Sequence, residues 1–494
     1  MKSQTIIIGA GPAGLTAAYE LARAGRDAIV LEQDPLHVGG IARTESYKGF
    51  RFDIGGHRFF SKNAAIEDLW TTILGDQLIE RERLSRIYYR GRFFKYPLES
   101  LDVLRQLGVY EAAACIASYF AARIRPRRPL VSFEDWVTNA FGRRLFAIFF
   151  RTYTEKVWGI PCDQISADWA AQRIKDLSMG ALLGRTFSLR SRRDGPVIKT
   201  LIDRFRYPTL GPGQMWDTLA TQLRELGVVI QMDERVTAIE RDTGGITSVT
   251  TIGPRGPRTH HAEHFISTMP IRELIGALDP PAPAETAQAA RSLRYRDFIV
   301  VTLIIDRRHV FPDQWVYIHE PSVKVGRIQN FKNWSNAMVP DPRYTSLGLE
   351  YFCFNHDPMW QLDDAALIAL AKDELNRLGL ADPSLVVDGT VVRQREAYPV
   401  YEANYSKAIA VVRDFIEHKI PNLQLVGRNG MHKYNNQDHA MLTGLMAARN
   451  IMGDSYDLWR VNADALYLEE GEEGADGGRL FPQQVTTTAA PRTA

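Results

Sequence analysis

The sequence predicts an α/β fold that combines a Rossmann-like dinucleotide-binding domain, a helical subdomain and an antiparallel β-sheet subdomain. Three observations support this prediction. The first 34 residues follow the order strand, glycine-rich turn, helix, strand. Residues 96–200 place apolar side chains at three- and four-residue spacing, which is typical of helices. Residues 226–268 and 296–355 contain alternating and β-branched runs, which favour strands.

The composition excludes several classes of protein. The chain has 494 residues, of which 45% are hydrophobic and 24% charged, as in ordinary globular proteins. Its 60 basic and 58 acidic residues give a net charge of +2, so we expect no nucleic-acid partner. Cys115, Cys162 and Cys353 are too far apart to suggest a metal site or a disulfide framework. A reduced, cytoplasmic setting fits this cysteine usage.

No apolar run is long enough to predict a membrane span. The closest is residues 109–124, which Glu111 and Arg123 interrupt. We predict a buried amphipathic helix there. The apolar run at the N-terminus is short and broken by glycines, so it does not resemble a signal peptide.

The N-terminal unit carries a nucleotide-binding fingerprint. Residues 5–8 suit a buried strand and residues 15–24 a helix. Between them Gly9, Gly11 and Gly14 form GxGxxG, with Pro12 and Ala13 at the start of the helix. The three glycines would permit a tight turn, close approach to a pyrophosphate, and close packing of helix on strand. The alternative is a glycine-rich surface turn.

An acidic residue completes the fingerprint. Residues 28–31 suit a second buried strand, and Glu32 follows it 18 residues after Gly14. A carboxylate in this place can accept hydrogen bonds from ribose hydroxyls, while the helix N-terminus faces the phosphates. The order of these parts predicts a dinucleotide site.

A second glycine pair favours FAD over NAD. Gly39 and Gly40 are followed by Arg43 and Thr44 in the stretch GGIART. In FAD domains of the glutathione-reductase type, such a stretch brings backbone N–H groups and an arginine to the phosphates. The alternative is a flexible loop with an exposed arginine.

The remaining elements follow from periodicity. Residues 226–268 alternate, with turns at 242–245 and 254–258, and suggest antiparallel strands. Residues 363–378 suit an amphipathic helix, residues 423–427 a strand and residues 440–451 a helix. Two basic loops, residues 123–128 and 185–193, interrupt the helical region. The composition after about residue 466 predicts a disordered tail over 466–494.

Several blocks resemble one enzyme family. The start of the chain is similar to the flavin superfamily of amine oxidases, protoporphyrinogen oxidases and UDP-galactopyranose mutases. Later blocks are most similar to the mutases, especially their eukaryotic branch, and they occur in the expected order. These blocks are DIGGHRFFS (53–61), KYPLES (95–100), EKVWGIPCDQISADWAAQR (155–173), QWVYIHE to VGRIQNFKNWS (314–335), EAYPVY (396–401) and GRNGMHKYNNQDHAMLTG (427–444).

The resemblance implies a division into three parts. An FAD-binding domain would comprise residues 1–95, 205–275 and 420–460. A helical subdomain would occupy residues 96–204, and an antiparallel sheet that binds substrate would occupy residues 276–419. FAD would be bound noncovalently, since no cysteine lies in the block at 427–444.

The resemblance also implies which residues meet the flavin. The loop of His57 would lie against the flavin ring, although His57 could instead be a structural histidine. Arg428 ends a strand, and Asn436 precedes a helix whose N-terminus could face the cofactor. The other expected cofactor contacts are Gly55, Gly56, Val236, Gly427, Gln437, Asp438 and Met441.

Substrate contacts follow in the same way. Arg173 and Arg327 match the two arginines that clamp the substrate diphosphate in this family. Glu99 stands where the UDP-using mutases have glutamine; it could accept hydrogen bonds from guanine, or simply be solvated. The other expected contacts are Tyr96, Trp169, Tyr317, Asn330, Trp334, Tyr398 and Tyr434, of which Trp334 replaces the usual tyrosine.

Three functions remain open from the sequence. The resemblance favours a mutase that interconverts the pyranose and furanose forms of a UDP- or GDP-linked sugar through a sugar adduct at N5 of reduced FAD. NAD(P)H or another donor would reduce the cofactor. The second reading is an oxidoreductase of the amine oxidase or protoporphyrinogen oxidase type. The third is a binding protein resembling GDP-dissociation inhibitors, which the intact GxGxxG and GGIART disfavour.

Overall fold

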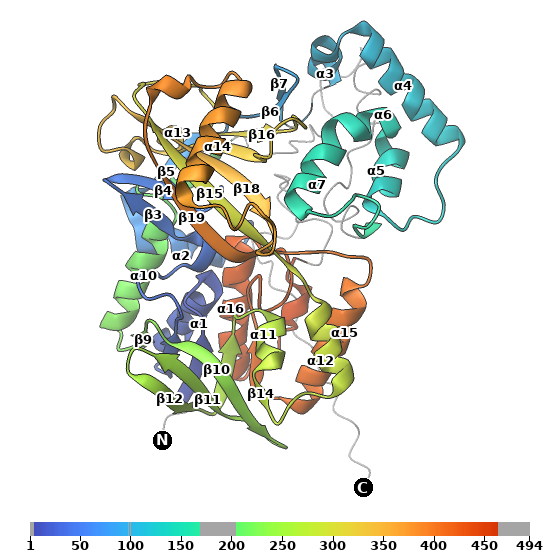
Figure 1. The fold of residues 1–494 in the computed structure, drawn as a ribbon. Helices are drawn as coiled ribbons and strands as arrows, with labels where there is room; N and C mark the ends of the chain where they lie inside the picture. The colour runs from blue at the N-terminus through green and yellow to red at the C-terminus, as the bar shows by residue number, and fades with distance from the viewer. Residues whose placement is uncertain (1–3, 97, 99, 168–203, 463–494) are drawn as a thin grey trace.

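The computed structural model describes residues 4–96, 98, 100–167 and 204–462. Figure 1 shows three parts: a lower body that contains the first and last described residues, a sheet above it, and a lobe of helices beside that sheet. Glu99, Trp169, Arg173, the second basic loop and the predicted tail lie outside the described residues.

The lower body is built on a parallel sheet of five strands. The strand order is β20-β13-β1-β2-β9, which places the N-terminal strand at the centre. Three helices pack together beside it: α1 (Pro12–Arg23), α10 (Gly213–Glu225) and α16 (Gln437–Ile451). The strands are β1 (Gln4–Ile8), β2 (Asp27–Leu31), β9 (Val229–Gln231), β13 (His264–Ser267) and β20 (Leu423–Leu425).

A second sheet and four more helices complete the lower body. The sheet has the order β12-β11-β10-β14. Its strands are β10 (Arg235–Asp242), β11 (Gly245–Gly253), β12 (Gly256–His261) and β14 (Leu278–Asp279). The helices are α2 (Ala64–Leu74), α11 (Ile271–Gly276), α12 (Ala284–Ser292) and α15 (Tyr405–Lys419). Apolar side chains of α12 and α15 join the core of the parallel sheet.

The upper sheet has seven strands in the order β19-β15-β18-β17-β16-β6-β7. All neighbours are antiparallel except β16 and β6. Helix α14 (Asp364–Arg377) packs against β15 and β19. The strands are β6 (Ser85–Tyr89), β7 (Arg92–Lys95), β15 (Tyr295–Ile305), β16 (Trp315–Ile318), β17 (Arg327–Asn330), β18 (Thr345–Cys353) and β19 (Val386–Pro399).

Short elements connect these parts. Two hairpins are β3 (Thr44–Tyr47) with β4 (Phe50–Asp53), and β5 (Leu78–Glu82) with β8 (Arg204–Pro208). A single helical turn, α13 (Phe331–Trp334), follows β17. The 3₁₀ turns are Gly40–Ala42, Gly75–Gln77, Asn336–Met338, Pro383–Leu385 and Leu458–Arg460.

The helical lobe comprises α3 to α7 and has its own aromatic core. Its elements are α3 (Ser100–Leu107), α4 (Val109–Ile124), α5 (Phe133–Phe141), α6 (Arg143–Phe146), a π-helical turn (Ala147–Arg151) and α7 (Thr152–Trp158). Helix α5 begins with a capping box between Ser132 and Asp135, in which two orphan backbone donors are satisfied reciprocally.

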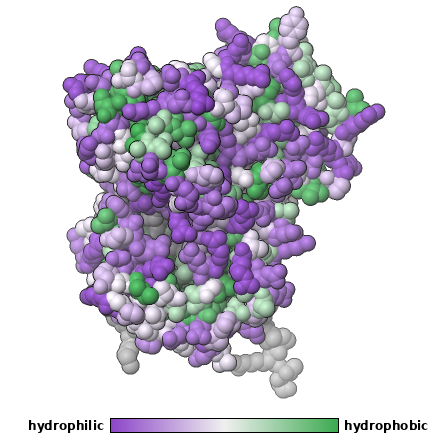
Figure 2. Space-filling view, in the orientation of Figure 1, coloured by the Kyte–Doolittle hydropathy of each residue, from purple (hydrophilic) through white to green (hydrophobic). Residues whose placement is uncertain are grey.

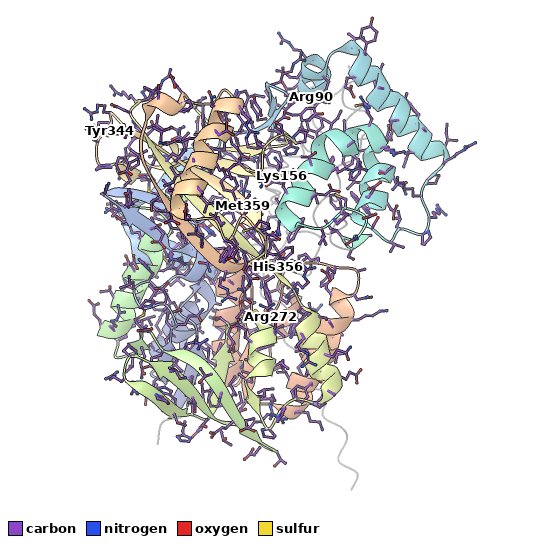
Figure 3. The ribbon with its side chains drawn as sticks, viewed as in Figure 1. Arg90, Lys156, Arg272, Tyr344, His356 and Met359 are labelled. Atoms are coloured by element: carbon purple, nitrogen blue, oxygen red, sulfur yellow. The ribbon has the colours of Figure 1, made fainter. Side chains whose placement is uncertain are left out.

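Two cationic side chains fix helix α7 to the upper sheet. Lys156 of α7, labelled in Figure 3, donates to the carbonyl oxygens of Ile318 (3.3 Å), Glu320 (2.6 Å) and Val325 (3.1 Å). From β15, Arg296 donates to the carbonyls of Lys156 (3.4 Å) and Val157 (3.3 Å), which are orphan acceptors at the end of the helix. The position of α7 is therefore set by hydrogen bonds as well as packing.

Two predictions about the fold need correction or adjustment. The helix over residues 109–124 forms with those bounds, but it is not buried: Tyr110 is 95% exposed and Ile124 78%. It lies at the outer edge of the lobe and covers α5 and α6 with one face only. The division into three parts also differs in detail, because β6 and β7 join the upper sheet while α12, β14 and α15 belong to the lower body.

Candidate active-site cleft

The glycine-rich turn after β1 has the geometry of a nucleotide cradle. Gly9 has φ of +99°, a conformation that favours glycine. A Cβ on Gly14 would overlap the carbonyl oxygen of Gly9, so helix and strand cross closely only without a side chain. A Cβ on Gly11 would meet nothing within 4 Å. Gly11 is also the N-cap of α1 and offers no side chain that could accept from the first N–H groups of the helix.

Glu32 lies next to this cradle and connects it to the start of strand β10. The Glu32 carboxylate accepts from the backbone N–H of Ala10 (2.6 Å) and of Asp34 (2.9 Å). Burial raises the pKa of Glu32, and these two hydrogen bonds act against that shift. Val236 is the second residue of strand β10, two positions after Glu234, whose N–H donates to the carbonyl of Glu32 (2.8 Å).

The second glycine pair forms a tight turn, but its arginine faces protein groups. Gly39 and Gly40 have φ of +92° and +54°. The guanidinium of Arg43 donates through Nε to Glu45 (2.7 Å) and through NH1 to Gln394 (2.8 Å). The structure thus connects Arg43 to β3 and β19 rather than to the cleft.

The His57 loop follows β4 and enters the cleft. Gly55 has φ of +91°, and a Cβ on Gly56 would lie 3.0 Å from Nε2 of Gln329. His57 Nε2 donates to the carbonyl of Ile54 (2.9 Å), which assigns the proton to that nitrogen. Burial, together with the charges of Arg428 and Arg327, lowers the pKa of His57 to about 4, so its ring is neutral at pH 7.

The cleft lies between the His57 loop, the upper sheet and the N-terminus of α16. It has a volume of about 190 Å³. Three arginines and several aromatic side chains surround it. The lining residues are Gly56, His57, Arg58, Phe59, Phe60, Trp315, Tyr317, Arg327, Gln329, Trp334, Tyr398, Arg428, Tyr434, Asn436, Gln437 and Asp438.

Arg327 is oriented by a buried carboxylate. It stands on β17 opposite Glu350 of β18, whose side chain is fully buried and accepts from Arg327 Nε. Burial lowers the pKa of Arg327, but the charge of Glu350 and neighbouring tyrosine hydroxyls outweigh burial and raise it. Arg327 NH2 donates to the hydroxyl of Tyr398 (3.2 Å). One edge of the guanidinium is thus held by Glu350 while the side chain lines the cleft.

Glu350 also fixes a glutamine. Gln329 Nε2 donates to Glu350 Oε1 (2.8 Å), which decides the orientation of the amide. Although Gln329 lines the cleft, its buried amide oxygen has no hydrogen-bond partner in the described part of the chain. An unpaired buried acceptor costs about 1–3 kcal/mol, so it marks a place where a ligand donor would be favoured.

A second cation stacks on two tyrosines. Tyr398 and Tyr434 are parallel, with ring centroids 5.7 Å apart and an interplanar angle of 13°. The guanidinium carbon of Arg428 lies 5.2 Å from the ring of Tyr398 and 4.9 Å from that of Tyr434. Arg428 Nε donates to the carbonyl of Asn435 (3.0 Å). Cation–π contact and the hydrogen bond keep the charge beside the cleft.

An aromatic wall closes the other side. Trp315 and Trp334 stack with centroids 5.1 Å apart, and Trp334 Nε1 donates to the carbonyl of Gln314 (3.1 Å). Tyr317 packs against Tyr96, with centroids 4.8 Å apart. The indole of Trp334 is therefore satisfied by protein and presents no hydroxyl to the cleft.

The N-terminus of α16 faces the His57 loop. Asn436 is the N-cap and forms a capping box with His439. Gln437 Nε2 lies 3.4 Å from the carbonyl oxygen of His57. Asp438 is buried in the first turn, whereas Met441 points into the core and accepts a hydrogen bond from Trp70 Nε1 through its sulfur (3.0 Å). A Cβ on Gly427, just before this block, would lie 3.3 Å from Cβ of Ala13 in the cradle.

Eleven of the predicted site residues line the cleft: Gly56, His57, Tyr317, Arg327, Trp334, Tyr398, Arg428, Tyr434, Asn436, Gln437 and Asp438. Others lie elsewhere. Asn330 is buried and donates to the carbonyl of Phe311 (3.2 Å), so it does not line the cleft. Arg43 and Met441 likewise make protein contacts. Of the expected arginine pair, Arg327 lies in the cleft and Arg173 is outside the described residues.

Sequence reasoning missed Glu350, Gln329 and Arg58. Glu350 carries a detectable signal, because it is the one charged residue in the otherwise uncharged run TSLGLEYFC. A carboxylate in a buried strand must be paired, so a cationic partner on the neighbouring strand could have been expected. Arg58 adjoins the predicted His57 and lies 5.8 Å from the ring of Trp315.

The residues present fit a flavin dinucleotide. The uncapped start of α1, the open space above Gly11 and the second glycine turn can receive a pyrophosphate. Gly55 and Gly56 let the backbone approach a flat ring at the cleft. Within the described ranges, no group of three or more His, Cys, Asp or Glu side chains could hold a metal ion. The three cysteines are free and buried.

Comparisons with known proteins agree with this geometry. The sequence model of a family described as flavin-containing amine oxidoreductases matches residues 12–452. AofH of Mycobacterium tuberculosis, to which flavin-containing monoamine oxidase activity is ascribed, is 27% identical over 301 residues. That match covers 58% of this chain, and the chain spans about three fifths of AofH (61%).

Solved structures show the same fold. A reduced UDP-galactopyranose mutase has a TM-score of 0.81 at 23% identity, covering 94% of this chain and 98% of that one. A protein of Exiguobacterium sp. 255-15, assigned as a protoporphyrinogen oxidase, has a TM-score of 0.68 at 18% identity, covering 91% and 99%. The family match implies FAD as the cofactor. The chain therefore belongs to the family of flavin-containing amine oxidoreductases and shares the fold of the solved mutase.

Proposed function

We propose that this protein is a flavin-dependent mutase that interconverts the pyranose and furanose forms of a nucleotide-linked sugar. The observation that carries the proposal is Arg327, held by buried Glu350 and lining a cleft beside the His57 loop. Because Glu350 holds one edge of the Arg327 guanidinium and keeps it charged, its other N–H groups could bind the oxygens of a diphosphate. The likeness in fold to a UDP-galactopyranose mutase supports the same reading.

Each part of the cleft has a proposed task. Arg327 would bind the diphosphate and stabilise the charge that grows on it as the bond to the sugar breaks. Arg428 would add a second positive charge, and the hydroxyls of Tyr398 and Tyr434 could bind phosphate oxygens. The aromatic wall would exclude water from the reacting sugar. Arg173 and Glu99 stay candidates for the second clamp and for reading the base.

The cofactor would be held by the glycine cradle, Glu32 and the start of α16. When bound, FAD in its reduced form would supply the nucleophilic ring atom for this chemistry, so a donor such as NAD(P)H would be needed to reduce it. Neutral His57 would hold its loop in shape through the bond to Ile54, while the side chain of Gln437 meets the His57 carbonyl.

The test is product formation by the reduced protein. Dithionite-reduced protein is incubated with UDP- and GDP-linked hexoses and pentoses, and ring isomers are separated by chromatography. We expect an isomer only with reduced flavin. Equal product from oxidised protein would refute the mechanism. A colourless protein, without flavin absorbance, would instead favour a binding protein.

The second candidate is an amine-oxidising enzyme, which the relation to AofH favours. It would be an oxidoreductase with net electron transfer to FAD. Under anaerobic conditions an amine would then bleach the oxidised flavin in proportion to product, and nucleotide sugars would produce no isomer. The cationic lining of the cleft disfavours this reading, because Arg327 and Arg428 would repel a protonated amine.

A further inference from the structure

An apolar surface lies on the outside of the helical lobe. Tyr110, Ala113, Ala117, Phe120 and Ile124 of α4 follow one another at spacings of three and four residues, so they share one side of the helix. Val109 is 83% exposed and Phe120 54%, in addition to the two residues named above. We call these six residues the outer α4 face. Figure 2 shows exposed hydrophobic groups in this part of the molecule, where Figure 1 draws α4.

Packing within the lobe does not require this face. The opposite side of α4 buries Ala112, Cys115 and Tyr119, which already join the lobe to α5 and α6. A helix that is apolar all round is normally buried or in contact with lipid. Contiguous exposed apolar surface of this kind marks a contact with another body.

Arginines surround the same surface. Residues 109–131 contain four arginines and one acidic residue, Glu111. Glu111 is engaged by Arg144, whose NH2 donates to it at 2.9 Å. Arg123, Arg125 and Arg128 are exposed and form no ion pair with any described acidic residue. Beyond them in the sequence, Leu130 and Val131 are exposed as well.

The charge decides between two occupants. If a second copy bound here through a two-fold axis, the arginine clusters of both copies would meet a surface with no free carboxylate among the described residues. An anionic lipid surface offers acyl chains for Phe120 and Ile124 and negative headgroups for the three arginines. No helix within the described ranges is long and apolar enough to cross a bilayer. A helix lying in the plane of the interface is consistent with this.

We infer that the outer α4 face binds the surface of a bilayer containing anionic lipids. The apolar side chains would enter the boundary between headgroups and acyl chains, with Arg123, Arg125 and Arg128 at the headgroup level. The opening of the proposed active site is formed by other elements, so binding here would leave the cleft free. The inference does not depend on the proposed catalytic function.

Co-sedimentation of the full-length, flavin-loaded protein with vesicles tests it. Vesicles of phosphatidylcholine alone are compared with vesicles containing 30% phosphatidylglycerol. We expect at least tenfold stronger binding to the anionic vesicles, and weakening as salt rises. The double variant Phe120→Ser/Ile124→Ser should lower the partition coefficient about tenfold or more. The triple variant Arg123→Gln/Arg125→Gln/Arg128→Gln should abolish the preference for phosphatidylglycerol.

Matched controls separate this surface from general stickiness. Leu226→Ser/Val387→Ser removes two side chains that are 53% and 56% exposed elsewhere on the molecule, and it should bind as wild type. Flavin absorbance and thermal unfolding show that each variant is folded. Absence of binding to anionic vesicles overturns the inference. The inference is also overturned if the Phe120→Ser/Ile124→Ser variant binds vesicles as strongly as the wild type. It is likewise overturned if the only effect of this variant is to convert a dimer in solution into a monomer.

Discussion

At the scale of single residues, the cleft depends on a carboxylate that never reaches it. Glu350 is fully buried on β18, yet it holds Nε of Arg327 and Nε2 of Gln329, which both line the cleft. The register of β17 and β18 makes this possible, because Arg327 lies directly opposite Glu350. The direction of the guanidinium is therefore set by strand pairing and not by a loop.

Replacing Glu350 should weaken anion binding without loss of cofactor. In Glu350→Gln, Arg327 keeps its charge but loses its partner, so we expect about tenfold weaker binding of UDP or GDP by calorimetry. The unpaired buried charge should cost about 3 kcal/mol in free energy of unfolding. Flavin content should not change.

A similar pair elsewhere is the control for Glu350. Asp313 is fully buried and accepts from Arg86 NH2 (2.7 Å), but neither residue lines the cleft. Asp313→Asn should lower stability and leave the UDP and GDP affinities unchanged. If both variants weakened binding alike, the effect would be due to instability and Glu350 would not orient Arg327.

Gln329 should contribute to ligand binding more than to folding. Its amide oxygen has no partner among the described residues, so Gln329→Met removes one unsatisfied acceptor and one hydrogen bond to Glu350. We expect stability to change by less than about 1 kcal/mol. Affinity for a nucleotide sugar should fall about fivefold to tenfold, and affinity for the nucleoside diphosphate alone should not. Equal losses for both ligands would place Gln329 away from the sugar.

At the scale of elements, local patterns predicted position better than burial. The strand at residues 5–8, the helix at 363–378 and the hairpin turn at 242–245 were all expected, and the structure has β1, α14 and the β10–β11 turn there. Helix α4 has the predicted bounds, but its burial was predicted wrongly. Periodicity identifies an apolar face, whereas only tertiary contacts decide whether that face meets the protein or its surroundings.

Helix α7 should loosen when Lys156 is replaced. Lys156→Met leaves the carbonyls of Ile318, Glu320 and Val325 without their shared donor. We expect a loss of about 2–3 kcal/mol in free energy of unfolding. Amide hydrogens of α7 should exchange faster, because the helix is no longer fixed to the upper sheet.

Lys332 provides the control for Lys156. Its ammonium group also serves three carbonyls, including those of Arg308 (2.9 Å) and Tyr344 (3.0 Å), but far from the helical lobe. Lys332→Met should destabilise the protein and leave exchange in α7 unchanged. Faster exchange in both variants would mean that α7 follows global stability.

At the scale of the whole molecule, motif order predicted the fold, whereas contacts across the sequence did not follow from it. GxGxxG and the later blocks led to a flavin fold because each has a local physical reason or a family counterpart. The contact between Arg43 and Gln394 joins residues 351 positions apart, and no local pattern anticipates it. The same holds for Met441, which faces Trp70 across two packed helices.

Buried titrating groups from different parts of the fold determine the response to pH. Burial lowers the pKa of His57 and His432 to about 4 and that of His319 to about 3. In the unfolded chain a histidine titrates near 6.5, so these residues contribute stability above about pH 6.5 that is lost as pH falls. Asp53 acts in the opposite direction, because burial raises its pKa to about 7. Its contribution is present below about pH 4 and is lost as pH rises through 7.

Removing Asp53 should therefore make the protein more sensitive to acid. The amide oxygen in Asp53→Asn can still accept from the Tyr207 hydroxyl, which lies 2.5 Å from the carboxylate, so the fold should be kept. Between about pH 4.5 and 6.5 the wild-type protein carries a proton on Asp53 when folded but not when unfolded, and Asp53→Asn removes this difference. The slope of the free energy of unfolding against pH should therefore rise by about 1.4 kcal/mol per pH unit. Urea titrations at several pH values measure this slope. The control is Asp163→Asn, which replaces an exposed carboxylate and should leave the slope unchanged. An unchanged slope in Asp53→Asn would mean that Asp53 is ionised in the folded protein despite its burial.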